Sequence, residues 1–186
     1  VYSIASMAFH SAHLREITLP EQIQDVRSES FSNTPQLENI FVTGEYSLYR
    51  SFDGVLFDCR NGVNHSTLVK YPNGKNAESY TIPENTAALA EKCFAENTVL
   101  SQIHLPASLA EIGSNAFGNA VLTDVYFAGT QEQWDAITIG SDNTHLTNAM
   151  LPCLEIVASG ACGKYLTWTL NAAGTLTISG TGAMTN

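Results

Sequence analysis

Charged side chains are scarce in this 186-residue chain, at 14% of the residues, and the basic ones are the scarcest. The chain has 8 lysines and arginines against 18 aspartates and glutamates, which gives a formal net charge of −10 at pH 7. A field of this sign repels phosphate backbones and anionic membrane surfaces. We therefore expect no nucleic-acid partner.

Cysteine is also too scarce to hold a chain of this length together. The four cysteines are Cys59, Cys93, Cys153 and Cys162, and no C-x-x-C pair indicates a zinc site. Buried free thiols are the simpler interpretation. A bridge from Cys153 to Cys162 stays open, since nine residues separate them and can close a loop, although nothing in the sequence requires it.

Long apolar runs are missing as well, because none approaches the roughly 20 residues of a membrane span. The first residues, VYSIASMAFH, lack the basic, apolar and cleavage regions of a signal peptide. This leaves the compartment open, because a mature or excised piece of a protein would lack those regions too.

Motifs of catalysis and of metal binding are absent from the sequence. It contains no H-E-x-x-H, G-x-S-x-G, G-x-x-x-x-G-K or EF-hand loop. His10 and His13 have no third ligand nearby in sequence, and His65 and His145 lie in polar stretches. Residues 142–144 (Asp-Asn-Thr) fit a turn better than a cation site. We expect no enzyme, no cofactor and no metal.

The chain does contain a repeated spacing of apolar residues. In LSQIHLPASLAEIGSNAF, residues 100–117, successive apolar positions lie 3, 2, 4, 3 and 5 residues apart, which fits neither a helix nor a simple strand. LREITLPEQIQDV, residues 14–26, has the same spacing, and Phe31 follows five residues after Val26. Partial copies follow Phe31 and Phe117, and YTIPENTAALAEKCF keeps the same offsets up to Phe94.

A repeat of about 22 residues predicts a leucine-rich solenoid, in which stacked turns bury what one turn cannot. Within each copy, the two apolar residues that lie two apart mark a strand, and the proline that follows ends it. The second apolar pair returns the chain along another wall, and the phenylalanine fills the interior. Thr86 stands where an apolar residue is expected, so we expect loose packing in the turn from 80 to 94.

The repeat is interrupted from about residue 43 to residue 79. There DGVLFD and STLVKYP predict two strands of an inserted hairpin, with turns at residues 61–62 and 72–74. After Phe127, GTQEQWDAI predicts a short helix that Thr130 caps and that closes the last turn. Farther on, the alternation of Leu166, Trp168 and Leu170, and then of Leu176 and Ile178, predicts a β-hairpin too small to be stable alone.

These units resemble the BspA-like leucine-rich repeats of bacterial surface proteins. IASMAF, LREITLPEQIQDV and LSQIHLPASLAEIGSNAF carry the likeness, and residues 112–117 match the I-G-x-x-A-F signature of that repeat. The insertion FDGVLFD…TLVKYPNGK, the end segment YFAGTQEQWDAITIGSDNTHL and the β unit SGACGKYLTWTLNAAGTLTISGTGAM resemble other parts of the same family. The expected division is repeats over 1–129, an end cap over 130–150 and an incomplete β unit over 151–186.

The resemblance implies a β-rich leucine-rich-repeat solenoid of the right-handed β/α superhelix class. It implies secretion or display on a bacterial surface, with the repeats used for adhesion to or recognition of host or microbial proteins or glycans. It implies no catalysis, and it suggests that the chain is a monomeric fragment of a larger protein. A structural spacer that holds out another domain is the alternative function.

Candidate ligand-binding residues follow from the alternation along the predicted strands. The residue between the last two apolar positions of each strand points outward. Rings in such a column can stack on sugars or anchor a protein, and polar neighbours can supply hydrogen bonds. Whether Phe41 and Tyr126 are free or covered by the insertion and the end helix stays open. The expected outer column is Thr18, Phe41, Thr81, His104 and Tyr126, and the column beside it is Glu16, Asn39, Gln102 and Asp124.

Overall fold

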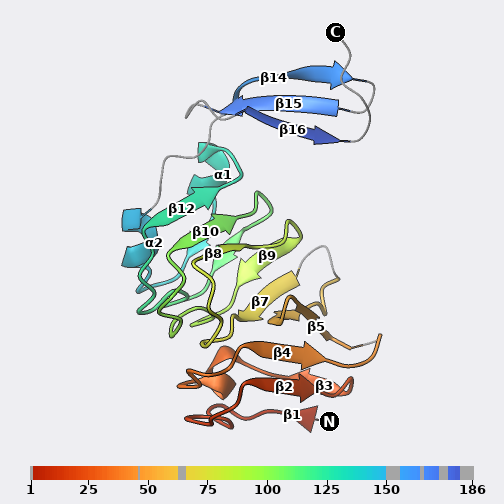
Figure 1. Cartoon of the computed structure of the whole chain (residues 1–186), viewed down its shortest axis with the longest axis vertical. Helices are drawn as coiled ribbons and strands as arrows, with labels where there is room; N and C mark the ends of the chain where they lie inside the picture. Colours follow the sequence, from red (N-terminus) through yellow and green to blue (C-terminus); the bar gives the residue numbers. More distant parts are fainter. Residues whose placement is uncertain are drawn as a thin grey trace.

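The computed structural model describes residues 2–45, 47–62, 66–149, 156–163, 166–171 and 176–180. Up to residue 149, the described chain winds into strand-rich turns that stack from the N-terminal end towards α2 (Figure 1). Short strands on two walls enclose the apolar interior. The predicted β-rich repeat solenoid is thus confirmed.

The first wall, which we call the strand wall, consists of parallel strands that each begin a turn of the solenoid. β2 pairs with β4, and β8, β10 and β12 form a three-stranded sheet. The inward residues Ile40, Ile103 and Val125 are fully buried, as the spacing of two predicts. The strands are β2 (Glu16–Leu19), β4 (Asn39–Val42), β8 (Ser79–Thr81), β10 (Gln102–Leu105) and β12 (Asp124–Phe127).

The second wall, which we call the return wall, is built by the second apolar pair of each repeat. β1 pairs with β3, while β11 pairs with β9 on one side and β13 on the other. Ile112 therefore lies between Leu89 and Ile139 in register. The strands are β1 (Tyr2–Ser3), β3 (Ile23–Asp25), β9 (Thr86–Leu89), β11 (Glu111–Ile112) and β13 (Thr138–Ile139).

The repeated phenylalanines fill the space between the two walls. Phe31, Phe94 and Phe117 are completely buried, and Phe31 lies in the 3-10 helix η1 (Ser28–Phe31). The rings of Phe94 and Phe117 are stacked, with centroids 5.1 Å apart and planes 9° apart. That distance is close to the spacing of adjacent strands, so each turn places its ring on the ring of the turn before.

The glycine of the I-G-x-x-A-F signature allows the turns to approach closely. A Cβ atom on Gly113 would lie 2.5 Å from the backbone nitrogen of Glu91 in the preceding turn, which is closer than real Cβ atoms come. Gly140 has the same relation to the nitrogen of Ser114 one turn later. At these two positions a side chain would thus push neighbouring backbones apart.

The turn from 80 to 94 differs from the expectation of loose packing. Thr86 is completely buried, and the ring of Tyr71 contacts those of Tyr80 and Phe94, with centroids 4.9 Å and 5.0 Å away. The expectation was wrong because Tyr71, which the insertion supplies, fills the interior beside this turn. The Thr86 hydroxyl is left without a hydrogen-bond partner.

The insertion is an antiparallel meander of three strands, β5 (Tyr49–Phe52), β6 (Val55–Asp58) and β7 (Ser66–Lys70). The predicted hairpin corresponds to β6 and β7, while β5 was not predicted. β7 also pairs in parallel with β9, so the meander extends the return wall into a six-stranded sheet. β3 stays outside that sheet, which leaves a break in the return wall between β3 and β7.

A short helix follows the last strand of the strand wall, as predicted. α1 (Gln131–Asp135) begins with a capping box in which Thr130 and Gln133 exchange hydrogen bonds. Trp134 packs edge-on against Phe127, with ring centroids 5.4 Å apart. α2 (Thr144–Ala149) follows. In the described part of the chain, no helix has both the length and the apolar character needed to cross a membrane.

The last described residues form a separate antiparallel sheet of β14 (Ile156–Gly163), β15 (Leu166–Asn171) and β16 (Leu176–Gly180). Trp168 pairs with Ile178 and Leu170 with Leu176, in the hairpin that the alternation predicts. Cys153 lies outside the described residues, so its pairing with Cys162 is not tested. Cys59 and Cys93 are free thiols, and Cys93 is completely buried.

Candidate functional site

Three of the candidate residues form one row on the outside of the strand wall. Thr81 lies beside His104, and His104 beside Tyr126, in the registers of β8, β10 and β12. The rings of His104 and Tyr126 are stacked, with centroids 4.6 Å apart and planes 11° apart. In the next row, the Gln102 amide donates to the Asp124 carboxylate at 3.3 Å. We call these five residues the outer strand face.

The other four candidates lie on the separate β2–β4 pair. Thr18 is in register with Phe41, and Glu16 with Asn39. β4 pairs with β2 and not with β8, and the backbone nitrogen of Ile40 donates to the oxygen of Gly54 in the β5–β6 turn. The expectation of one continuous column of five residues was therefore wrong, because the insertion occupies the place of a strand.

Neither the insertion nor the end helix removes the aromatic candidates from the surface. The Phe41 side chain is 41% exposed. Tyr126 and His104 are both half-buried, and each covers one face of the other's ring. Of the candidate rings, His104 and Tyr126 are thus brought together, and Phe41 stands apart from them. Their role in binding stays a prediction.

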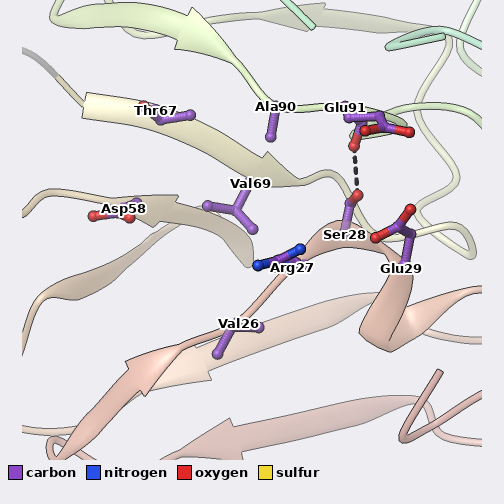
Figure 2. Close-up of a pocket in the computed structure, with 9 residues that line it drawn as sticks. All are labelled: Val26, Arg27, Ser28, Glu29, Asp58, Thr67, Val69, Ala90 and Glu91. Atoms are coloured by element: carbon purple, nitrogen blue, oxygen red, sulfur yellow. Dashed lines mark hydrogen bonds between the residues drawn. The ribbon is translucent and has the colours of Figure 1, made fainter. Parts of the chain in front are cut away.

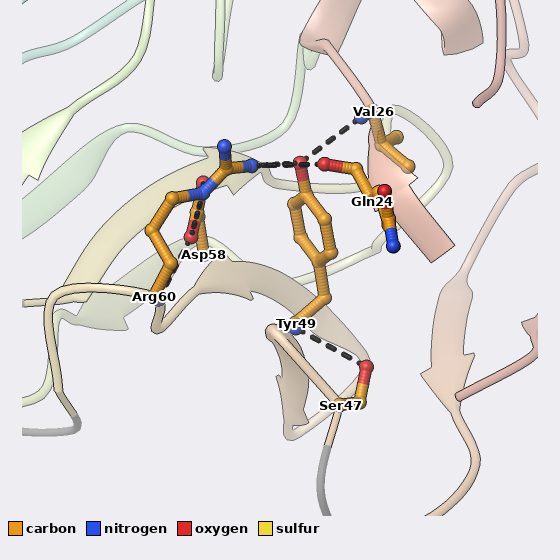
Figure 3. A network of polar contacts seen from close by, with 6 residues as sticks. All are labelled: Gln24, Val26, Ser47, Tyr49, Asp58 and Arg60. Carbon is orange, nitrogen blue, oxygen red and sulfur yellow. Dashed lines mark hydrogen bonds and ion pairs between the residues drawn. The ribbon is translucent and has the colours of Figure 1, made fainter. Parts of the chain in front are cut away.

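A network of side chains bridges the break in the return wall (Figure 3). The backbone nitrogen of Val26 donates to the Tyr49 hydroxyl at 3.0 Å. Arg60 donates to the same hydroxyl at 2.8 Å and to the backbone oxygen of Gln24 at 3.2 Å, while its ion pair with Asp58 spans 2.8 Å. Burial raises the pKa of the Tyr49 hydroxyl.

A pocket of about 240 Å³ opens at this break, and we call it the seam pocket (Figure 2). Sequence analysis missed it, although the loss of the repeat between 43 and 79 marks the place where the two blocks of turns meet. Its lining comes from the segment after β3 and the start of η1, from β6 and β7, and from the segment after β9. These residues are Val26, Arg27, Ser28, Glu29, Asp58, Thr67, Val69, Ala90 and Glu91.

The charged residues of the seam pocket are mostly paired with one another or with neighbours. Lys92 forms ion pairs with Glu29 at 3.0 Å and with Glu91 at 3.2 Å, and Asp58 is held by Arg60. The Ser28 hydroxyl donates to the backbone oxygen of Glu91. Arg27 differs from these, since its exposed side chain has no hydrogen bond or ion pair with any residue that the structure describes.

A smaller hollow of about 30 Å³ lies next to the seam pocket, and Lys70 lines it. The Lys70 side chain is 1% exposed. Burial lowers its pKa, and the nearby Glu96 opposes that effect. Burial also raises the pKa of the neighbouring Cys93 thiol to about 12. The volume is enough for a water molecule and too small for an organic ligand.

Histidine and acidic side chains do not gather into a metal site among the described residues. His10 is hydrogen-bonded to the Ser32 hydroxyl at 3.0 Å. In residues 142–144, Asn143 is buried and bonds to backbone groups, with its amide donating to Gly113 and Gly140 at 2.9 Å. Asp142 and Asn143 thus lie in the bend before α2, and Thr144 begins that helix. His65 lies outside the described residues.

Comparisons with known proteins agree with this architecture. A family model described as a BspA type leucine rich repeat region matches the chain in six copies, over residues 1–67 and 70–152. No curated protein matches the chain.

Two solved bacterial structures are similar to the chain. A leucine rich cell surface protein from Faecalibacterium prausnitzii A2-165 is 27% identical with a TM-score of 0.59, over 66% of this chain and 32% of that one. The pneumococcal vaccine antigen PcpA is 24% identical with a TM-score of 0.57, over 70% of this chain and 36% of that one, which shows the fold alone. The chain matches about a third of the length of either protein.

Proposed function

Because the chain belongs to the BspA-type leucine-rich repeat family, we propose that it is a non-enzymatic recognition module of a secreted or surface-displayed bacterial protein. The outer strand face binds an extracellular protein or glycan. The solved cell surface protein from F. prausnitzii, which has a similar fold, supports a surface location.

The observation that carries the proposal is the stacked pair of His104 and Tyr126. Two rings on adjacent strands at 4.6 Å form a rigid, amphipathic platform. Such rings supply contact area with little loss of conformational entropy, and they stack on sugars or protein side chains. Gln102 and Asp124, one row away, offer an amide and a carboxylate for hydrogen bonds.

The size of the outer strand face limits the ligand. Three strands about 4.8 Å apart cover much less than the roughly 800 Å² that each partner of a stable protein complex buries. The face therefore suits a glycan, or one contact of a multivalent interaction in which other turns take part.

The test is an array of glycans and extracellular-matrix proteins probed with this chain and with a His104→Ala/Tyr126→Ala double variant. We expect the double variant to bind at least one ligand about tenfold or more weakly, because aromatic rings that a ligand covers contribute most of the binding free energy at such contacts. Val121→Ala, which alters an exposed residue outside the face, is the matched control and should bind like the parent chain. Thermal unfolding of each variant checks that it is folded.

The Phe41→Ala variant tests whether the β2–β4 pair takes part in binding or only the β8–β10–β12 sheet. If only the β8–β10–β12 sheet binds, Phe41→Ala keeps full affinity. The absence of binding to any array member, or equal binding by the double variant, would contradict the proposal. The first of these results would favour the spacer function, in which the turns only hold another domain away from the surface.

A further inference from the structure

The break in the return wall creates a cavity that the regular turns lack. β3 pairs only with β1, and β7 pairs with β6 and β9, so no backbone ladder joins β3 to β7. The Tyr49 and Arg60 side chains hold the edge of β3 beside this break. The seam pocket of about 240 Å³ remains next to them, on a different wall from the outer strand face.

The floor of the seam pocket is apolar and firmly packed. Val26 and Val69 are each 4% exposed, and they belong to the core of the N-terminal turns. Ala90 adds a methyl group from the segment after β9. In Figure 2, Arg27 is drawn between Val26 and Val69, with Glu91 and Ser28 beyond them. A ligand here meets hydrocarbon on one side and polar groups at the rim.

The rim carries charges of both signs, and most of them are paired with one another or with neighbours. An anionic ligand would meet the carboxylates of Glu29, Glu91 and Asp58, in a chain whose net charge is −10. A cationic ligand would meet Arg27, and Lys92 already neutralises the two glutamates. Because the charges of both signs are interspersed, an ion of either sign meets repulsion as well as attraction.

A neutral polyhydroxylated ring fits this mixture of groups. Sugar hydroxyls both donate and accept, so they can donate to Glu91 and accept from the unpaired guanidinium of Arg27. The C–H face of the ring can lie on Val26 and Val69. The volume lies just below the usual range of small-molecule sites, which leaves room for one ring and not for an oligosaccharide.

We propose that the seam pocket binds a single neutral sugar residue, with Arg27 and Glu91 as the groups that recognise its hydroxyls. This site is separate from the outer strand face and does not depend on the function proposed for it. The pocket offers the Arg27 guanidinium as a donor and the Glu91 carboxylate as an acceptor, and none of the described lining residues is aromatic. The expected Kd is therefore in the millimolar range.

The proposal is tested by saturation-transfer NMR on the full chain with the methyl glycosides of glucose, galactose, mannose and N-acetylglucosamine. Glucuronate and glucosamine are the charged probes. We expect saturable binding of at least one neutral glycoside and weaker or no binding of both charged probes. A charged probe that binds more tightly than every neutral one, or no neutral ligand that binds in the millimolar range, overturns the proposal.

Two variants test whether the ligand binds in the seam pocket. Arg27→Ala and Glu91→Gln should each weaken the neutral ligand by about tenfold or more, since each removes a hydrogen bond to a charged group. Arg15→Ala, which alters an exposed arginine that pairs with Glu38 and does not line the seam pocket, is the matched control and should keep the affinity. The His104→Ala/Tyr126→Ala double variant should keep it too. Unchanged binding in Arg27→Ala, or a loss in either control, overturns the assignment to this pocket.

Discussion

The stack of turns from β9 to β13 and the seam between β3 and β7 join neighbouring turns by different means. In the stack, the nitrogen of Gly113 donates to the oxygen of Leu89 at 2.8 Å, and one turn later Gly140 donates to Ile112 at 2.7 Å. At the seam, the backbone nitrogen of Val26 and the backbone oxygen of Gln24 are bonded to the side chains of Tyr49 and Arg60 instead.

This difference determines which residues each region depends on. A backbone ladder uses groups that every residue other than proline carries, so it tolerates changes of sequence as long as the backbones can approach. A seam closed by side chains depends on the particular residues that reach across it. The insertion should therefore be the part of the solenoid that is most sensitive to the loss of single polar side chains.

The largest expected effect comes from Asn97, which ties the end of the insertion to the following turn. Its side-chain oxygen accepts from the backbone nitrogens of Val99 and Leu100, at 3.0 Å and 2.8 Å. Asn97→Ala leaves the buried Leu100 nitrogen and the partly buried Val99 nitrogen unpaired, so the free energy of unfolding should fall by about 3 kcal/mol or more. Its amide donates to the backbone oxygens of Pro72, Asn73 and Lys75.

Urea unfolding measures the effect of Asn97→Ala. Asn119→Ala, which alters an exposed asparagine in the next turn, is the control and should change stability by less than about 0.5 kcal/mol. Equal losses of stability in the two variants would contradict the role given to the hydrogen bonds of the Asn97 side chain.

The regular stack should instead be sensitive to bulk at its closest backbone contact. Gly113→Ala places a methyl group 2.5 Å from the nitrogen of Glu91, which forces two turns apart and should cost about 2 to 3 kcal/mol. Gly62→Ala is the comparison, because Gly62 has open space around it and a φ of +94°. It should cost only the strain of a left-handed alanine, about 1 kcal/mol. A smaller loss for Gly113→Ala than for Gly62→Ala would show that the turns can separate freely.

High pH should weaken the region beside the seam through Cys93. Burial raises the pKa of this thiol from 9.0 to about 12. Between these values the unfolded chain loses the proton while the folded chain keeps it. The stability that the raised pKa contributes is thus complete below pH 9.0 and is lost as the pH rises towards 12, by about 1.4 kcal/mol per pH unit. Lys70 contributes in the opposite direction. Because burial lowers its pKa, its contribution to the free energy of unfolding grows as the pH rises.

Urea unfolding between pH 8 and 10.5 tests this pH dependence. In Cys93→Ala the decline with rising pH should be shallower than in the parent chain. In Lys70→Met the decline should be steeper, because the opposing contribution of the lysine is removed. Parallel curves for the parent chain and Cys93→Ala would exclude the thiol as the source.

Tyr49 and Tyr71 allow a matched comparison of two buried hydroxyls. The Tyr49 hydroxyl accepts from Val26 and Arg60, so Tyr49→Phe should cost about 1.5 kcal/mol by leaving the Val26 nitrogen unpaired. The Tyr71 hydroxyl has no partner, so Tyr71→Phe should be neutral or stabilising. Thermal unfolding of the two variants measures the difference, and a larger loss for Tyr71→Phe would contradict the role given to the seam network.

The smallest expected effect is a gain of stability at Thr86. Its buried hydroxyl has no hydrogen-bond partner. Thr86→Val keeps the shape and removes the unpaired group, so the free energy of unfolding should rise by about 1 kcal/mol. Ser108→Ala is the contrasting change, because that hydroxyl donates to the backbone oxygen of Thr86 at 2.8 Å and its removal should destabilise. A loss of stability in Thr86→Val would mean that the hydroxyl is satisfied by water.

The repeated part of the fold was predictable from the sequence because its determinants are local and periodic. The spacing from Leu100 to Phe117 correctly predicts β10, the return along β11 and the buried ring. Thr130 and Gln133 correctly predict the capped start of α1. In each case, a residue's place in the repeat determines the neighbours that it meets.

The seam was not predictable because its contacts join segments that no period relates. Arg60 contacts Gln24 across 36 positions of sequence, and Tyr71 enters the interior of a turn that begins several residues later. The outer column was predicted with the correct residue at each strand, but its continuity depended on whether β4 and β8 pair. The insertion prevents that pairing, and the sequence alone does not say where a meander docks.

The stacked rings of Phe94 and Phe117 have a consequence for how such a protein changes over evolutionary time. Each turn presents to the next the same kind of surface that it received from the one before, so a duplicated or deleted turn creates no new type of contact. Recombination within the stack of turns from β9 to β13 can therefore change the number of turns without changing the type of contact between them. Across the seam the two faces differ, so a recombination event there would separate Tyr49 and Arg60 from the strand edge that they complete. The seam is thus the place where a change in the number of turns would lose contacts that a neighbouring turn does not replace.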